Sequence, residues 1–243
     1  MKNLWKLSFG LAVALALLVA QANAQTISLV SDTFTYPDGP LAGNGGWTAF
    51  SGSTTLNVLG NQATVTGANS QDVGLAVPGT HSSDEIFAAF DVTVNSWPTP
   101  GSGYFALFKD SSTFNFFART YVTNVTGGVQ FGITTGSAQP PIWSSTYTLG
   151  STHRLTISLD QTGPYLGVNM ASSLWVDGGL VGTSYSMINS NFAISEFALR
   201  QSNSTTMGNV LVDNLDVYVV PEPSTVFLVG LGLVGLVAIR RRK

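Results

Sequence analysis

Residues 153–160 read HRLTISLD, and this stretch decides the fold. His, Leu, Ile and Leu take its odd positions, and Arg, Thr, Ser and Asp take the even ones. Alternation with a period of two is typical of a β-strand that buries one face and exposes the other. The stretch therefore predicts a half-buried strand and does not fit the period of a helix.

The same period extends in both directions from this strand. It recurs in residues 26–34, 56–59, 62–66, 85–94, 103–109, 114–122, 129–134, 173–176, 192–200 and 209–220. Gly60-Asn61 separates two of these segments as a tight hairpin turn does, and Asp177-Gly178 likewise separates residues 173–176 from a returning segment that starts with Leu180-Val181. About ten strands without an amphipathic helix predict an all-β domain, an antiparallel two-sheet β-sandwich of jelly-roll type.

The first 24 residues have the composition of a secretory signal peptide. Lys2 and Lys6 supply a positive start, residues 7–20 are almost wholly apolar, and Ala22 and Ala24 form an A-x-A cleavage site. We expect an N-terminal signal helix, removed after Ala24 by signal peptidase once the secretion machinery has engaged it. An uncleaved anchor is the alternative.

The last 23 residues form a tail with three parts. Pro221, Glu222 and Pro223 make a rigid, extended start, because a residue before proline avoids the α region. Residues 225–239 carry no charge and predict a short transmembrane helix. The chain then ends in four cations that should stop translocation and stay cytoplasmic: Arg240, Arg241, Arg242 and Lys243. A buried core helix is the alternative, but a core does not accept four unpaired cations.

This order of Pro-Glu-Pro, apolar helix and basic end closely resembles the PEP-CTERM sorting signal of Gram-negative bacteria that make exopolysaccharide. The resemblance implies an exosortase, a membrane transpeptidase, as partner, with Pro221, Glu222 and Pro223 as its recognition residues. It implies an inner-membrane anchored precursor that later reaches the cell surface or the extracellular, biofilm matrix. The tail itself would attach the precursor to the membrane.

Between the two ends, residues 25–220 form one acidic domain. They contain twelve carboxylates and four basic residues, Lys109, Arg119, Arg154 and Arg200. Such a balance excludes nucleic acid as a partner. Cysteine is absent, which excludes thiol catalysis and thiolate metal sites within the chain. Ser, Thr, Asn and Gly dominate the polar residues, and such surfaces suit hydrated glycans.

Three short motifs in the domain resemble concanavalin A-like (laminin G-like) sandwich domains. They lie in residues 32–47, which open with Asp32-Thr33-Phe34, in residues 153–155 with 174–178, and in residues 212–217. The resemblance implies two stacked antiparallel sheets, frequent carbohydrate binding and sometimes a calcium ion. Because these domains include glycanases as well as structural modules, the resemblance does not choose between those functions.

The residues do not point to an enzyme. Glycoside hydrolysis needs two neighbouring carboxylic acids, but the only glutamates in the domain, Glu85 and Glu196, lie far apart in the sequence. No G-x-S-x-G motif is present. His153 alternates into a strand face and is expected to pack there, and His81 is expected to be solvated. A glycan-active enzyme remains the less favoured alternative.

Two tryptophans in proline-containing loops are candidates for sugar binding. Trp97 lies within SWPTPGSG and Trp143 within GSAQPPIWSS, with Tyr147 behind Trp143. Exposed aromatic faces are what a sugar ring stacks on. The alternative for Trp143 is that it caps one end of the sandwich. Trp47 and Trp175 lie inside the sandwich motifs and are expected in the core.

The sequence predicts no cofactor, and calcium, which takes oxygen ligands, is the metal that best suits the domain. Asp32 follows the first predicted strand, while Asp213 and Asp216 lie on the last one, so the three meet if the terminal strands pair. The alternative is that the last two are solvent-facing strand positions. Taken together, the sequence predicts a non-enzymatic exported protein whose sandwich binds carbohydrate or associates with the matrix. A structural or adhesion protein without a specific ligand is the alternative.

Overall fold

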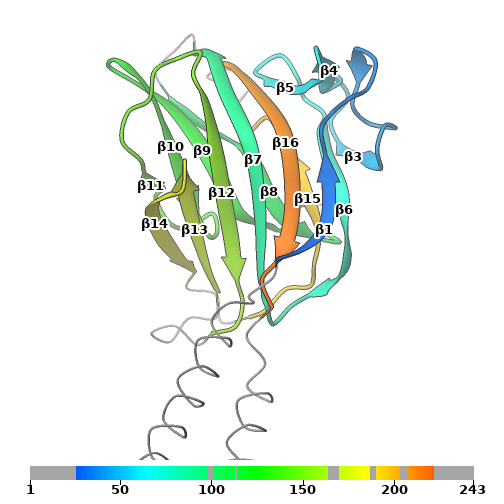
Figure 1. The fold of residues 1–243 in the computed structure, drawn as a ribbon, viewed down its shortest axis with the longest axis vertical. Coiled ribbons are helices and arrows are strands. Elements are labelled where there is room, and N and C mark those ends of the chain that lie inside the picture. Colours follow the sequence, from blue (N-terminus) through cyan, green and yellow to red (C-terminus); the bar gives the residue numbers. More distant parts are fainter. Residues whose placement is uncertain are drawn as a thin grey trace, which may run out of the picture. The chain divides into compact units, whose positions relative to one another are not determined.

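Strand pairing arranges the domain into two antiparallel sheets (Figure 1). The computed structural model describes residues 26–97, 101–112, 114–163, 170–186, 190–202 and 207–221. All regular elements in these ranges are strands, and residues Ser28–Val219 form one compact unit. The predicted all-β, two-sheet sandwich is therefore confirmed.

The nine-stranded sheet has β7, β12 and β16 at its centre. Its order is β14 (Gly179–Ser186), β13 (Met170–Val176), β12 (Thr152–Asp160), β7 (Glu85–Ser96), β16 (Asn209–Val219), β5 (Gln62–Thr66), β4 (Asn57–Leu59) and β2 (Gly39–Pro40), with β1 (Ile27–Asp32) also paired to β16. Residues 153–160 thus lie in β12, between β7 and β13.

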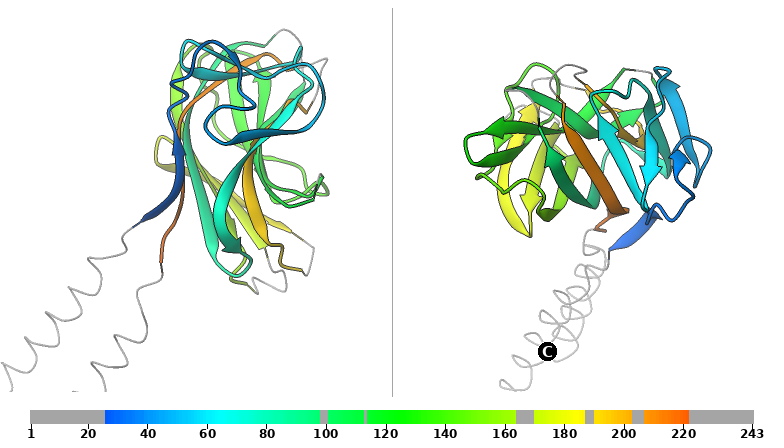
Figure 2. Two further views of the ribbon diagram at one scale, coloured as in Figure 1. Left: turned by 90° about the vertical axis from the view of Figure 1, so that its right-hand side faces the viewer. Right: turned by 90° about the horizontal axis from the view of Figure 1, so that it is seen from above.

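The seven-stranded sheet packs behind it, and Figure 2 views the two layers edge-on. Its order is β11 (Ile142–Trp143), β10 (Gly128–Thr134), β9 (Phe116–Val125), β8 (Ser102–Asp110), β15 (Ile194–Leu199), β6 (Asp72–His81) and β3 (Trp47–Ser51). Each sheet therefore has an inner face toward the core and an outer face.

The core lies between the inner faces. Leu155, Ile157 and Leu159 of β12 are fully buried, as the alternation in this stretch predicts. Phe90 of β7 reaches across the sandwich, with its ring centroid 6.3 Å from that of Phe105 and 5.5 Å from that of Phe197. Because side chains alternate along a strand, these inward-facing residues determine which of their neighbours lie on the outer faces.

Both predicted hairpin turns are present. Gly60 and Asn61 have φ values of 58° and 62°, and Asp177 and Gly178 have values of 51° and 79°. Two consecutive positive φ values are the mark of a type I′ turn, which matches the twist of the strands on either side.

Strand β6 was not among the predicted strands. Its alternating Val73, Leu75 and Val77 face the core, but Pro78 and Gly79 interrupt the pattern. The register with β15 shifts at this point, so the two interrupting residues lie in a bulge. Strand β3 and the two-residue strands β2 and β11 were missed as well.

The first and last strands of the domain lie side by side in the nine-stranded sheet, where β1 pairs with β16 as the calcium argument required. Pro221 is exposed. Within the ranges that the structure covers, no helix is long and apolar enough to span a membrane. The remaining terminal predictions fall outside the described residues: Ala22, Ala24, Glu222, Pro223, residues 225–239, and the cations Arg240 to Lys243.

Candidate functional site

Trp97 is not available to a sugar. Its side chain is only 5% exposed and belongs to the core between the sheets. Its indole N–H is buried without a hydrogen-bond partner among the described residues. The expectation that Trp97 presents an exposed ring is therefore wrong, because the ring turns inward after β7 ends.

Trp143 lies on the outer face of the seven-stranded sheet. Phe131 and Ile133 of β10 face the core, so Gly132 between them faces outward, and Trp143 pairs with it. A Cβ atom at Gly132 would lie 2.6 Å from Cε3 and 2.7 Å from Cζ3 of Trp143. The indole therefore covers Gly132 and stays partly exposed, and it does not cap an end of the sandwich.

Tyr147 lies apart from Trp143. Its backbone bridges to Val129, and its ring packs on the core, 4.4 Å from the His153 ring and 5.7 Å from the Phe131 ring. Tyr147 therefore joins the two sheets at their edge, and the structure does not bring it to the outer face with Trp143.

Trp143 is one end of a row of aromatic side chains across the outer face, which we call the aromatic belt. Ring centroids are 6.2 Å apart from Trp143 to Tyr121, 5.3 Å from Tyr121 to Tyr104, 6.4 Å from Tyr104 to Phe116 and 6.2 Å from Phe116 to Phe50. The belt thus draws on β11, β9, β8 and β3. Residues 103–109 and 114–122 carry aromatic residues at alternate positions, and this pattern is the feature of the sequence from which the centre of the belt could be predicted.

Basic side chains lie among these rings. The Arg119 guanidinium is 5.2 Å from the Tyr104 centroid, and the Arg200 guanidinium is 4.9 Å from that of Phe116. Lys109 Nζ lies 4.9 Å from the Phe50 centroid. Cations at these distances are attracted by the ring faces. Three of the four basic residues of the domain therefore belong to this one face.

Two of these three cations are paired with carboxylates. Lys109 Nζ donates to Glu196 Oε1 at 2.8 Å, and Arg200 Nη1 donates to Asp72 Oδ2 at 2.8 Å. Burial raises the pKa of Asp72, although the hydrogen bond from Ser51 and the charge of Arg200 oppose the shift. Burial likewise raises the pKa of Tyr104, so its phenol keeps its hydrogen at neutral pH.

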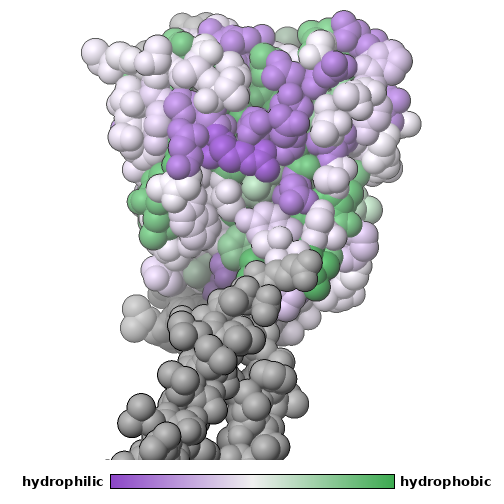
Figure 3. Space-filling model, in the orientation of Figure 1, coloured by the Kyte–Doolittle hydropathy of each residue, from purple (hydrophilic) through white to green (hydrophobic). Residues whose placement is uncertain are grey.

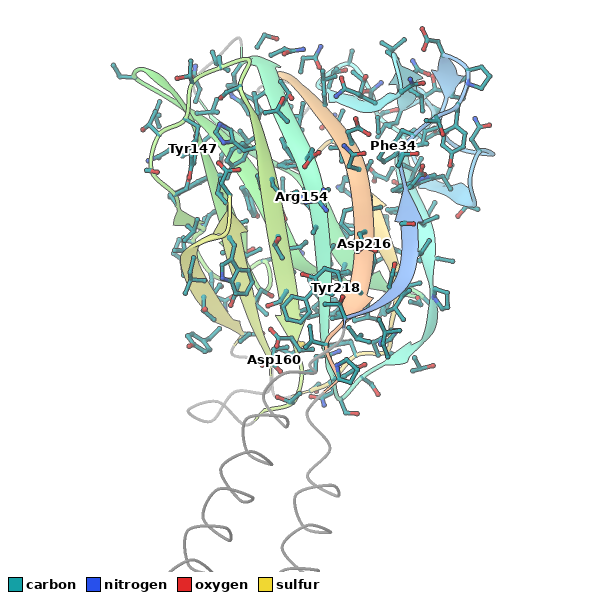
Figure 4. The ribbon with its side chains drawn as sticks, viewed as in Figure 1. Phe34, Tyr147, Arg154, Asp160, Asp216 and Tyr218 are labelled. Carbon is teal, nitrogen blue, oxygen red and sulfur yellow. The ribbon has the colours of Figure 1, made fainter. Side chains whose placement is uncertain are left out.

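A second aromatic group lies on the outer face of the nine-stranded sheet. Phe87 stacks on Tyr218, with ring centroids 5.2 Å apart, and lies 6.4 Å from Trp175. Tyr218 is labelled in Figure 4, on the lower part of this face. Trp175, which was expected in the core, is instead half-buried on the outside, because core residues Leu174 and Val176 flank it.

Carboxylates surround this second group. Glu85 pairs across the ladder with Asp160, which accepts hydrogen bonds from Thr162. Burial raises the pKa of Glu85, and the negative charge of Asp160 adds to the shift. The fold therefore places a glutamate beside an aspartate 75 positions away in the sequence, a neighbour that sequence reasoning did not find.

The upper part of this face is polar, as the hydrophilic band in Figure 3 shows. Arg154 Nη1 donates to Asp91 Oδ1 at 3.1 Å and to the Asn214 carbonyl at 2.6 Å, while Asn214 Nδ2 donates to Asp91 Oδ2 at 2.8 Å. Arg154 is thus neutralised by Asp91. The outer face of the nine-stranded sheet has an acidic balance as a result.

The three carboxylates of the predicted calcium site have protein partners. The Asp32 carboxylate already accepts hydrogen bonds from Phe34 N at 2.7 Å, Tyr36 Oη at 3.0 Å and Trp47 Nε1 at 2.6 Å. Asp216 accepts one from Ser28. Burial raises the pKa of Asp213, with the charges of Asp91 and Asp32 adding to it. No cluster of three metal-binding side chains occurs in the described part of the chain.

Ser151, His153 and Asp177 lie at the distances of a catalytic triad. Ser151 Oγ is 2.8 Å from His153 Nε2, and His153 Nδ1 is 2.7 Å from Asp177 Oδ2. However, Ser151 Oγ also lies 2.5 Å from the Thr148 carbonyl, which only accepts. The single hydroxyl hydrogen of Ser151 therefore points to the Thr148 carbonyl and not to His153, so the serine is not set up as a nucleophile. This arrangement ties the loop before β12 to the β13–β14 turn.

Residues 219–243 match the PEP-CTERM protein-sorting motif. The motif therefore begins at Val219, the last residue of β16. It implies an exported, membrane-passing precursor with an exosortase as its processing partner. No curated protein matches the chain.

Solved structures with the same architecture include carbohydrate-active and carbohydrate-binding domains. The alginate lyase Aly36B, in complex with an alginate tetrasaccharide, matches with a TM-score of 0.50 and 14% identity over 79% of this chain and 96% of its own. The carbohydrate recognition domain of Emp47p matches at 0.50 and 10%, over 81% and 97%. The CBM2 module of the evolved Dit of Lactobacillus casei BL23 phage J-1 matches at 0.52 and 9%, over 81% and 96%. At these identities the similarity shows the β-sandwich fold.

Proposed function

We propose that this exported protein is a non-enzymatic carbohydrate-binding module of the cell surface or extracellular matrix, and that it holds polysaccharide on the aromatic belt. The observation that supports this most is Trp143, whose indole covers Gly132 and remains partly exposed on an outer face. A ring that packs on a rigid sheet offers a stacking surface that loses little freedom on binding. Tyr121, Tyr104 and Phe50 are partly exposed and continue that surface across the sheet, whereas Phe116 is buried among them.

Affinity electrophoresis of the full-length chain in detergent, through gels that contain polysaccharide, tests this proposal. We expect retardation of the wild type and a loss of about tenfold in affinity for Trp143→Ala, the effect of one lost aromatic contact. Trp175→Ala is the matched control, since it removes a half-buried tryptophan from the opposite outer face. If no polysaccharide, including that of the source cell, retards the protein, the binding proposal is wrong and a structural role without a ligand replaces it.

The Glu85–Asp160 pair favours a second candidate, a glycan-cleaving activity on the other face. One carboxyl with a raised pKa beside another carboxylate is the arrangement that glycoside hydrolysis uses, and Phe87 and Tyr218 lie beside it. We favour the non-enzymatic function because Asp160 is already engaged by Thr162. Release of reducing ends by the wild type, abolished in Glu85→Gln, would establish the enzyme instead.

A further inference from the structure

We infer that the aromatic belt selects polysaccharides whose sugars carry carboxylate groups over neutral ones, and that Arg119 makes the selection. This inference rests on the proposed function, and it names the chemical class of the ligand. Its basis is the placement of charge on the two outer faces and the state of the three cations among the belt's rings.

Charge is divided unevenly between the two outer faces. Lys109, Arg119 and Arg200 lie on the belt's face with two carboxylates, Asp72 and Glu196. The opposite face has one cation, already paired, and five carboxylates: Glu85, Asp91, Asp160, Asp213 and Asp216. In a domain this acidic, a face with more cations than carboxylates is the place where an anionic ligand meets least repulsion.

Arg119 is the cation that remains for a ligand. Its Nε donates to the Phe116 carbonyl at 3.3 Å, and no carboxylate in the described ranges lies within ion-pair distance of it. Its guanidinium stays between Tyr104 at 5.2 Å and Phe116 at 5.7 Å. The sheet therefore positions the Arg119 side chain, and the N–H groups of its Nη1 and Nη2 atoms can donate to a ligand.

Arg200 strengthens the anionic preference at the same place. Its guanidinium lies 5.7 Å from the Tyr104 centroid and 4.9 Å from that of Phe116, so both arginines flank the same two rings. Asp72 neutralises the charge of Arg200, so the two arginines and Asp72 together carry one net positive charge. The phenol hydrogen of Tyr104 is one more donor beside them.

A carboxylated sugar ring fits this combination of groups. A guanidinium donates two parallel hydrogen bonds to a carboxylate, which is stronger and more directional than its bonds to sugar hydroxyls. The apolar face of the same sugar can stack on Tyr121 or Trp143, which lie next along the belt. A neutral sugar would keep the stacking and lose the charge-assisted pair.

The test compares polygalacturonate with the same polymer after its carboxyl groups have been reduced to alcohols. Affinity gels are run with the full-length chain in detergent at about 0.15 M salt, where charges more than about 8 Å away are largely screened. We expect the wild type to bind the acidic polymer about tenfold more tightly than the reduced one, the effect of one charge-assisted pair. Arg119→Gln should lower acidic binding to the neutral level and leave neutral binding unchanged.

Two controls and three results decide the inference. Arg154→Gln removes a cation from the opposite face and should change neither affinity, and unchanged melting temperatures confirm that both variants fold. Equal binding of acidic and reduced polymer by the wild type would overturn the selection while the proposed function stands. Equal binding of dextran sulfate and polygalacturonate would overturn the carboxylate preference in favour of general anion attraction. No retention on any polymer would overturn the inference together with the proposed function.

Discussion

Gly132 determines where Trp143 lies, because the indole fills the space that a side chain at position 132 would occupy. We predict that Gly132→Ala lifts the ring from the sheet, since the new methyl group would lie within 2.7 Å of two ring carbons. Polysaccharide binding should then fall about as far as in Trp143→Ala, that is, about tenfold. Near-UV circular dichroism and affinity electrophoresis measure the two effects.

Gly136→Ala is the matched control for this substitution. A Cβ atom there would meet nothing nearer than 3.7 Å, so neither the spectrum nor the affinity should change. Full binding by Gly132→Ala, with an altered Trp143 signal, would show that the indole's position on the sheet does not matter to the ligand.

Single residues were the hardest level to predict from the sequence. Trp97 follows β7 in a proline-containing loop, yet it is buried, and Trp175 lies in a sandwich motif, yet it faces outward. The two errors have different origins. Loop composition does not say which way the Trp97 ring turns, whereas Trp175 was assigned to the core from a motif although strand alternation places it on the face opposite to Leu174 and Val176.

The β13–β14 hairpin is an element whose stability should depend on pH through Asp177. The hydrogen bond from His153, the backbone N–H of Arg154 and the charge of His153 lower the pKa of Asp177, and burial opposes them. A lowered folded-state pKa stabilises the protein above the unfolded value, about 3.9, and that contribution is lost as the pH falls through the folded value.

We therefore predict that Asp177→Asn is less stable than the wild type at pH 6 and equally stable near pH 2. Asparagine tolerates the positive φ of this turn position, so the change isolates the charge. The difference should stay below about 1 kcal/mol because Asp177 is half-exposed. Urea denaturation between pH 2 and 6 measures it, and a difference that persists unchanged at pH 2 would assign the effect to the turn's backbone instead.

Elements were predicted well where the alternation is unbroken and poorly where it is interrupted. β7, β12 and β16 were found nearly to their ends. β6 was missed, because Gly74, Pro78 and Gly79 hide its period. A side chain at Gly74 would meet the Glu196 carboxylate. That neighbour comes from a strand 120 residues later and cannot be seen locally.

At the scale of the molecule, the sequence predicted the two-sheet architecture but not the membership of the outer faces. The belt's rings come from strands that are neighbours only after folding: Trp143 reaches Tyr121 through the β10–β11 and β9–β10 ladders. Alternation shows that a strand has an outer face. Only strand order and register show which outer residues meet.

The central position of β16 has a mechanical consequence. A tensile load applied to the chain at Pro221 would pull β16 along its own axis, against an antiparallel ladder that runs from Val219 opposite Ile86 to Asn209 opposite Ser96. Because ladder hydrogen bonds lie across the strands, such a pull strains them together in shear. If the opposing load were applied at the Glu85 end of β7, which lies beside the end of β16, the ladder would break one residue pair at a time.

We predict that rupture force depends on where the second handle is placed. The chain has no cysteine, so engineered pairs give unique attachment points. In single-molecule pulling, Pro221→Cys with Asn95→Cys loads the ladder in shear and should withstand more force than Pro221→Cys with Asp84→Cys, which unzips it. Equal forces would mean that another strand yields first. A higher force in shear would make the strand that leads into the sorting motif the one best placed to carry tension from a surface-bound polymer.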